Sequence, residues 1–322
     1  MGSKLRYFVI RIVELLITLL IVSLLTFFAF SVIPGDTASV ILGPNATEAQ
    51  LQQFRTELGL DRPIYIQYFD WIRGAFTGDL GTSAAYKQPV TTLIADRLPV
   101  TIGMSVIALI MVILISYPMA IAGSRKPGKI LDQILSVIGH VLFAIPPFVL
   151  SILLVIIASS VFGFFALGRY TAPSVNFGGY VVSLLLPSFC IALPKIAMTF
   201  KFLRSSILTE KSSDYVRTAK SHGLTDLKIM FKHILPNSNV STITVISLVL
   251  SDILGGSLIV EQVFNLPGLG RLLIAAISRR DFPLLSGMVL YLAGITVLLY
   301  FAADILTAAA DPRISLGEED RA

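Results

Sequence analysis

The stretch Asp214–Pro236, DYVRTAKSHGLTDLKIMFKHILP, is a polar and basic interruption in an otherwise apolar half of the chain. Its pattern predicts two short helices. Asp214 lies in the first turn of the first helix, and Gly223 ends that helix because glycine adopts the left-handed backbone conformation of a helix C-terminus. Asp226 follows at the start of the second helix, and Pro236 is expected to end it.

The second helix carries apolar residues at helical spacing. Each helix would have roughly nine to eleven residues, a length that is marginal for an isolated helix in water. We therefore expect the pair to dock on another surface through the apolar face of the second helix, which consists of Leu227, Met230, Phe231 and Ile234.

The composition around this stretch is that of an integral membrane protein. Of the 322 residues, 55% are hydrophobic and only 14% are charged, and the mean hydropathy is +0.81. The net charge of +5 does not indicate a nucleic-acid partner, because the basic residues alternate with long apolar runs. We therefore expect this chain to be embedded in a lipid bilayer.

The apolar runs predict an all-α integral membrane protein with six transmembrane helices, each of about 20 residues. Of the 25 Lys and Arg residues, fifteen fall on the N-terminal side of this topology, nine fall on the other side, and Lys195 lies within a span. The positive-inside rule then places both termini in the cytoplasm. The expected spans are residues 8–30, 98–122, 133–160, 179–202, 240–262 and 284–308.

This topology divides the chain into four parts. They are a cytoplasmic N-terminus with the first span (1–30), an extracytoplasmic helical segment (31–97), a transmembrane core (98–308) and a cytoplasmic tail (309–322). The opening stretch lies in a cytoplasmic loop of the core, residues 204–238.

The extracytoplasmic segment has its own helix signals. Thr47 and Gln50 form a capping box, Gly59 ends the helix that follows, and Pro63 begins a second helix. This amphipathic pair either rests on the bilayer and the outer ends of the spans or docks an external partner. The residues that would face such a partner are Tyr68, Trp71 and Asp79.

Prolines and a few ionisable residues interrupt the central spans. A helix in lipid tolerates a break at a proline where protein or water satisfies the freed backbone groups. The helices broken in this way therefore either line a path through the membrane or are kinked so that they pack against one another. Asp252 is the most central charge, and we pair it with Lys195 or with water. The prolines are Pro118, Pro146, Pro147, Pro187 and Pro194, and the candidate polar residues of a pathway are His140, Lys195 and Asp252.

No pattern predicts an enzyme. The near-match to a phosphate-binding loop at Gly123–Ile130 has Ile130 in place of the Ser or Thr that holds magnesium, and it follows an apolar span, so a basic turn explains it better. The three histidines lack metal-ligand spacing. We expect no catalytic residue, metal or cofactor in this chain. Transport is then the natural function, driven by an ion gradient or by a separate motor.

A family resemblance narrows this expectation. Ala219, Gly223, Leu235 and Pro236 stand at the spacing of the cytoplasmic loop of ABC importer permeases, whereas Arg217 departs from that pattern. Thr218 and His233 depart as well. Four further stretches are similar to the dipeptide, oligopeptide and nickel permeases: Pro34–Asp36, Leu58–Ser83, Gly255–Pro283 and Asp311–Arg313.

The resemblance implies a half-channel in a bacterial or archaeal cell inner membrane. Such a permease pairs with a second permease, rests on two cytoplasmic ATPase subunits that bind ATP and magnesium, and receives cargo from an extracytoplasmic binding protein. The helices around Gly223 would couple to the ATPase during alternating access. The residues assigned to this coupling are Arg217, Ala219, Gly223, Leu227, Phe231, Leu235 and Pro236.

Alternatives remain at this point. A secondary transporter working without a motor would require paired ion-binding sites and an inverted repeat, and an intramembrane hydrolase would require a nucleophile and a base. Within the permease family, peptide is the first expected substrate because no metal-ligand cluster is evident. Nickel or a metallophore is the alternative, which His140 keeps open.

Overall fold

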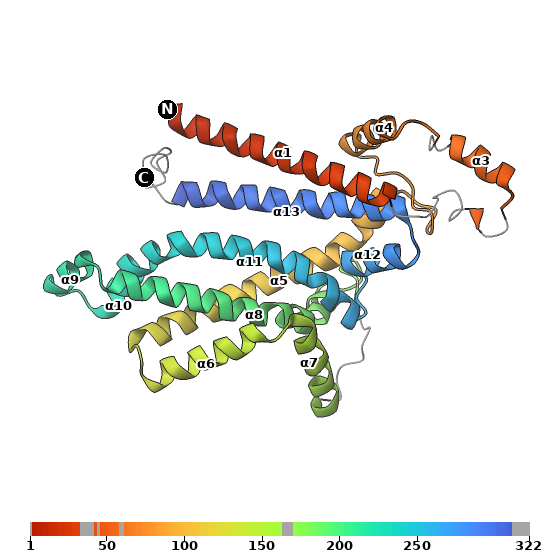
Figure 1. The fold of residues 1–322 in the computed structure, drawn as a ribbon. Coiled ribbons are helices and arrows are strands. Elements are labelled where there is room, and N and C mark those ends of the chain that lie inside the picture. The colour runs from red at the N-terminus through yellow and green to blue at the C-terminus, as the bar shows by residue number, and fades with distance from the viewer. Residues whose placement is uncertain (1, 33–41, 44–45, 58–60, 163–169, 311–322) are drawn as a thin grey trace. The chain divides into compact units, whose positions relative to one another are not determined.

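A computed structural model describes residues 2–32, 42–43, 46–57, 61–162 and 170–310 (Figure 1). In these ranges the chain is helical apart from turns and one isolated bridge between Thr82 and Pro89. The helices are α1 (Gly2–Val32), α3 (Glu48–Glu57), α4 (Ile64–Thr77), α5 (Val90–Arg125), α6 (Ile130–Ala144), α7 (Pro147–Phe162), α8 (Phe177–Lys211), α9 (Asp214–Ser221), α10 (Asp226–Ile229), η1 (Met230–Ile234), α11 (Leu235–Val263), α12 (Leu269–Ser278) and α13 (Phe282–Ala310).

Five stretches of helix within the described residues are long and apolar enough to cross a membrane, or six if α6 and α7 form one bent span. The all-helical, multi-span expectation is therefore confirmed at this level. Several helices extend beyond the expected spans, and in α5 and α8 the extensions carry buried apolar side chains. Val90, Leu93 and Ile94 are buried in the first turns of α5, and Leu203 and Ile207 are buried late in α8.

The prolines act differently from one another. Pro146 and Pro147 separate α6 from α7, which are bent by 104°, so the break expected in the third span is confirmed. Pro187 and Pro194 lie inside α8, which continues through both, and α5 continues through Pro118. Only the adjacent pair of prolines divides a helix.

The expected helix end at Pro236 is wrong. Instead of stopping there, the chain passes from α10 through the π-helical turn η1 into α11, and Pro236 lies in the first turn of α11. Proline has no backbone N–H to donate, and the first turn of a helix is a position that tolerates this loss. Wider π-turns are one way in which a helix accommodates such a change of hydrogen bonding.

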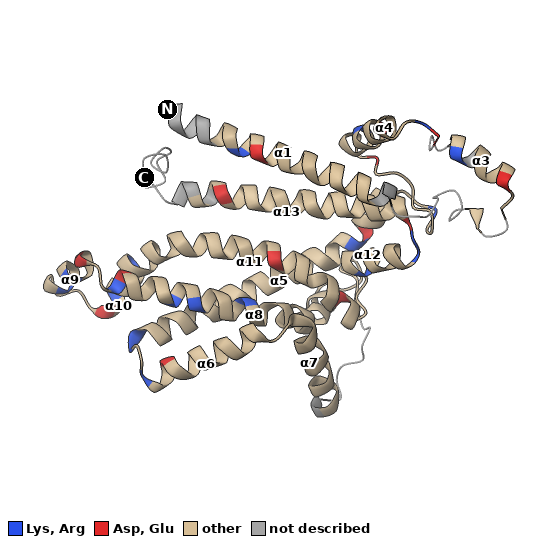
Figure 2. Cartoon of the chain, viewed as in Figure 1, with Lys and Arg blue, Asp and Glu red and all other residues tan. Residues whose placement is uncertain are grey.

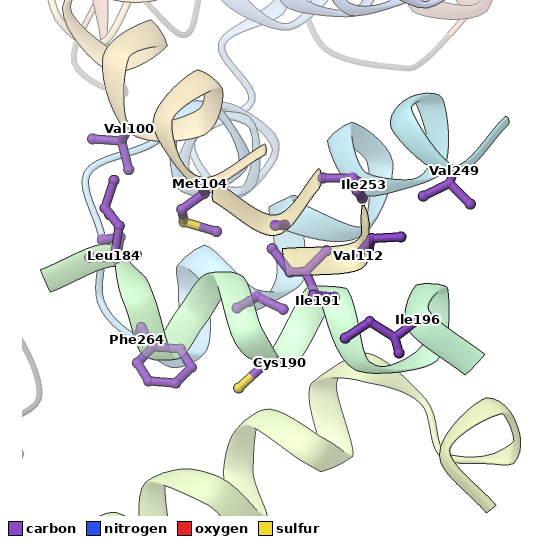
Figure 3. Close-up of a cluster of buried hydrophobic side chains, with 14 of the residues drawn as sticks. Val100, Met104, Val112, Leu184, Cys190, Ile191, Ile196, Val249, Ile253 and Phe264 are labelled. Atoms are coloured by element: carbon purple, nitrogen blue, oxygen red, sulfur yellow. The ribbon is translucent and has the colours of Figure 1, made fainter. Parts of the chain in front are cut away.

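The chain divides into two compact units, each with its own core. In the unit of residues 100–266 and 299–322, α5, α8 and α11 share a cluster of buried side chains (Figure 3). At Gly103, α5 lies so close to Tyr180 of α8 that a Cβ would collide with the phenol. The cluster includes Val100, Met104, Val112, Leu184, Cys190, Ile191, Ile196, Val249, Ile253 and Phe264.

The other unit comprises residues 1–99 and 267–298. The expected capping box is present, because the backbone N–H of Thr47 donates to the side chain of Gln50 at 2.9 Å. Pro63 precedes α4 as expected, whereas the expected helix end at Gly59 lies outside the described residues. The core of this unit joins α12, the first turns of α5 and the first part of α13.

Candidate coupling site

Gly223 ends α9 with a left-handed turn, as the sequence predicted. Its φ is +76°, its N–H donates to the carbonyl of Lys220 at 2.9 Å, and Leu224 donates to the carbonyl of Ala219 at 3.2 Å. This pair of bonds is a Schellman motif, which satisfies carbonyls at a helix C-terminus. Leu224 and Ala219 also share one hydrophobic cluster, so the turn is fixed by packing as well as by hydrogen bonds.

The loop is anchored to the transmembrane core through one set of apolar side chains. Two residues of α9, one of α10 and two of η1 contribute to this set. They pack with residues in the C-terminal parts of α5 and α8. This docking supplies the support that two marginal helices need. The buried set is Ala120, Phe200, Leu203, Ile207, Val216, Ala219, Ile229, Met230 and Ile234.

The apolar face expected on the second helix is divided in the structure. Met230 and Ile234 are buried, together with Ile229, which the sequence reading did not include. Leu227 and Phe231, by contrast, are each 57% exposed. Burial of large apolar side chains normally stabilises a protein, so this exposed pair is the part of the loop that is available to a partner.

The remaining assigned residues differ in exposure. Arg217 is exposed and lies 3.6 Å from Asp214 on the same helix, an ion pair that contributes little at such exposure. Gly223 and Pro236 are also exposed, and Leu235 is half-buried. Figure 2 shows Lys and Arg residues in α9, in α10 and at the adjoining end of α8, whereas most of the length of α11 carries no charged residue.

Tyr215 fixes the start of α9. Its hydroxyl donates to Glu210 at the end of α8, with 2.6 Å between the oxygens. Burial, followed by the hydrogen bond to Glu210, raises the pKa of Tyr215, so the phenol remains a hydrogen-bond donor at neutral pH.

Two long-range polar contacts hold the base of the loop. The guanidinium of Arg204 on α8 bonds to both carboxylate oxygens of Asp132 on α6, at 2.5 and 2.6 Å. Asp132 also accepts the N–H of Gly128 at 2.8 Å. Residues 126–129, within the stretch Gly123–Ile130, form the turn between α5 and α6, as the sequence predicted. Nearby, Lys211 donates to the carbonyl of Ser124 at 2.6 Å. Sequence reasoning missed this network, since its partners are far apart in the chain.

Of the candidate pathway residues, Lys195 and Asp252 form the expected ion pair. Lys195 on α8 donates to Asp252 on α11 at 2.8 Å, and 51% of the Asp252 side chain is exposed. His140 is exposed on α6, with its Nδ1 2.6 Å from the carbonyl oxygen of Ser136. Within the described ranges, no group of three or more His, Cys, Asp or Glu residues could hold a metal ion.

The three outer candidates differ in exposure. Tyr68 is buried, and its hydroxyl lies 2.8 Å from that of Ser23 on α1, so it supports α4 instead of facing outward. Trp71 is half-buried and Asp79 is exposed. Asp79 accepts the N–H of Gly81 at 2.8 Å.

Two buried carboxylates also escaped sequence analysis. Glu261 is fully buried and accepts a hydrogen bond of 2.7 Å from Thr101. Asp281 is fully buried and accepts from Ser83, Ala84 and Ala85. Both lie in Gly255–Pro283, one of the stretches that resemble the peptide permeases, but nothing in the sequence identifies the hydrogen-bond partners of either.

Comparison with known proteins agrees with this architecture. Residues 113–316 match the family described as binding-protein-dependent transport system inner membrane component, and residues 4–105 match the N-terminal region of such proteins. A protein of Brucella suis biovar 1, provisionally named a peptide transport system permease, is 36% identical over 94% of this chain and 97% of its own length. The oligopeptide transport system permease AppB of Bacillus subtilis is 33% identical over 92% of this chain and 95% of its own length.

A solved structure shares the fold. A chain of the MetNI methionine ABC transporter, in inward-facing conformations, superposes with a TM-score of 0.55 over 68% of this chain and 96% of that chain, at 17% identity. The present chain belongs to the family of binding-protein-dependent inner membrane transport components. It is a permease subunit of an ABC importer, and the resemblance to oligopeptide permeases is confirmed.

Proposed function

We propose that this chain forms one half of a channel that imports peptides through the cell membrane. The exposed pair Leu227 and Phe231, presented by a rigid turn at Gly223, is the observation that carries the coupling to a motor. Two of the relatives are named for peptide or oligopeptide transport. Nickel or a metallophore is less favoured, because no metal-ligand group occurs among the described residues.

The proposed assembly contains a second permease, two ATPase subunits and a substrate-binding protein. In this proposal the bent pair α6 and α7 counts as one span, and a chain with six spans has both termini on the same side of the membrane. The positive-inside rule favours the cytoplasm for that side and for the coupling loop. ATP and magnesium are bound by the ATPase subunits. ATP binding moves α9 and α10, and this motion changes the side of the bilayer that the central path faces.

Copurification tests the proposed assembly. A tagged permease is expressed together with the other proposed subunits and purified in mild detergent. It should retain an ATPase at two copies per pair of permeases. Mass spectrometry of the ligand that remains on the binding protein should identify a peptide. Repeated absence of an ATPase would favour a motor-independent transporter, and a bound metal complex would replace the peptide assignment.

The ion pair of Lys195 and Asp252 supports a path along α8 and α11. A charge near the bilayer centre costs roughly 2.5 to 3.5 kcal/mol on insertion scales, so the exposed part of Asp252 must face water or protein instead of lipid. Residues exposed on the same face of α11 include Leu248 and Ile259.

Cysteine labelling tests this path. In a Cys190→Ala background, Asp252→Cys and Leu248→Cys should react with a charged, water-soluble thiol reagent in the assembled transporter. Ile156→Cys is the matched control, because Ile156 is equally exposed on the apolar helix α7 and should not react. Equal reactivity at all three positions, or none at residue 252, would contradict the assignment.

A further inference from the structure

The buried carboxylate of Asp281 joins two turns that are distant in sequence. It accepts the hydroxyl of Ser83 at 2.5 Å and the N–H groups of Ala84 and Ala85 at 3.1 and 3.0 Å. It also accepts the N–H of Leu284 at 3.2 Å. A buried carboxylate with four donors is well satisfied, so Asp281 fixes the turn of residues 83–88 against the turn of residues 279–281.

Each of these turns holds a basic residue in an unfavourable backbone conformation. Lys87 and Arg280 have φ values of 56° and 53°, in the left-handed region that favours glycine. Such a conformation costs roughly 1 to 2 kcal/mol for other residues, and strained backbone of this kind concentrates at functional positions. Both side chains are exposed.

A third cation completes the cluster. The guanidinium carbon of Arg279 lies 5.1 Å from the ring centroid of Tyr86, the residue before Lys87. Within the part of the chain that the structure describes, Lys87, Arg279 and Arg280 form no ion pair with a carboxylate of this chain. Their charge is therefore directed to solvent or to a partner.

The proposed topology places this cluster on the outer side of the membrane, where the positive-inside rule leads us to expect few cations. We propose that Lys87, Arg279 and Arg280, named here the outer basic cluster, are a docking surface for an acidic face of the substrate-binding protein. This inference rests on the proposed function, because it uses the orientation and one of the partners given there. The rigid presentation by Asp281 favours a folded protein over lipid headgroups, which flexible cations would hold equally well.

Charge on such a surface acts mainly on the rate of association. Complementary charges steer two proteins together, and salt shortens the range of this attraction from roughly 30 Å at 0.01 M to about 8 Å at 0.15 M. The variant Lys87→Asn, Arg279→Gln, Arg280→Asn removes all three charges, and asparagine tolerates the left-handed conformation at positions 87 and 280. The fold should therefore survive, which an unchanged melting temperature would verify.

The test measures binding of the cognate binding protein to the whole transporter in nanodiscs of neutral phosphatidylcholine. At low salt the association rate should fall about tenfold in the variant, and the two rates should converge at high salt. A control removes three exposed cations from the end of α5 and the turn that follows it, through Arg125→Gln, Lys126→Gln and Lys129→Gln, and should bind at the wild-type rate.

Three results would overturn the inference. The first is an association rate of the outer variant equal to that of the wild type. The second is an equal loss of association rate in the control variant. The third is loss of copurified anionic lipid from the outer variant with its affinity for the binding protein intact, which would make the cluster a lipid site. If the wild-type transporter itself fails to bind the binding protein, the proposed assembly fails instead, so the two failures are distinguishable.

Discussion

Arg204 and Asp132 are 72 residues apart in sequence, yet they form a two-bond ion pair that holds α8 against α6 at the base of the coupling loop. Only 4% of the Asp132 side chain and 24% of the Arg204 side chain are exposed. Parallel bonds from one guanidinium to both oxygens of a carboxylate are among the stronger polar contacts in proteins. The contact therefore ties the start of α6 to the last part of α8, the helix that α9 follows in the chain.

Removal of either partner should destabilise the protein strongly. Asp132→Ala leaves the guanidinium without its partner, and such a loss costs roughly 3 to 5 kcal/mol for a buried pair. Arg204→Lys should also be destabilising, because an ammonium group cannot make both bonds. Melting temperatures of the purified transporter test this, and the surface variant Lys126→Gln should melt as wild type. A melting temperature unchanged by Asp132→Ala would show that the pair is dispensable.

Local signals explain which parts of this site the sequence predicted. Gly223 and the capping box of Thr47 and Gln50 depend on neighbours within a few residues, so their patterns are legible in the chain itself. The pairing of Arg204 with Asp132 and the bonds of Asp281 depend on tertiary packing. At Pro236, the turn η1 replaced the expected helix end, because tertiary contacts of Met230 and Ile234 keep the chain helical.

The pair of Lys195 and Asp252 should show energetic coupling. Lys195→Met leaves the carboxylate of Asp252 unpaired near the bilayer centre, and Asp252→Asn leaves the ammonium group unpaired, so each single variant should lower stability. The double variant should lose less stability than the sum of the two single losses, and the difference, the coupling free energy, should be on the order of 1 kcal/mol. A double-mutant cycle of thermal unfolding measures this quantity. Additive losses would mean that the two charges are separately solvated.

Gly223→Val should uncouple transport from ATP hydrolysis. Valine is β-branched and is strongly disfavoured at the φ of +76° found here, so the Schellman turn should open and α10 should lose its fixed position. There is open space around Gly223, so the protein should still insert and fold. Gly223→Asn is the matched control, since asparagine tolerates this conformation. Uptake and ATPase rates in proteoliposomes test the prediction, and unchanged substrate uptake by Gly223→Val would contradict it.

Leu227 and Phe231 should contribute to ATPase binding without contributing much to the fold. Each is 57% exposed, whereas their neighbours Ile229 and Met230 are 1% and 5% exposed. The few residues that dominate binding at the centre of an interface each cost more than about 1 kcal/mol when truncated, and we expect this exposed pair to be among them. Leu227→Ala and Phe231→Ala should therefore each weaken binding of the purified ATPase by about tenfold, which corresponds to roughly 1.4 kcal/mol.

The buried neighbours provide the opposite control. Ile229→Ala and Met230→Ala remove side chains from the hydrophobic cluster around Phe200 and Leu203 and should lower stability by roughly 2 to 5 kcal/mol. Melting temperature and ATPase affinity measured on all four variants separate the two roles. The exposed pair should change affinity at constant melting temperature, and the buried pair should change melting temperature first. If Leu227→Ala and Phe231→Ala left ATPase affinity unchanged, the motor would have to bind elsewhere on the loop, with exposed Arg217 as the next residue to test.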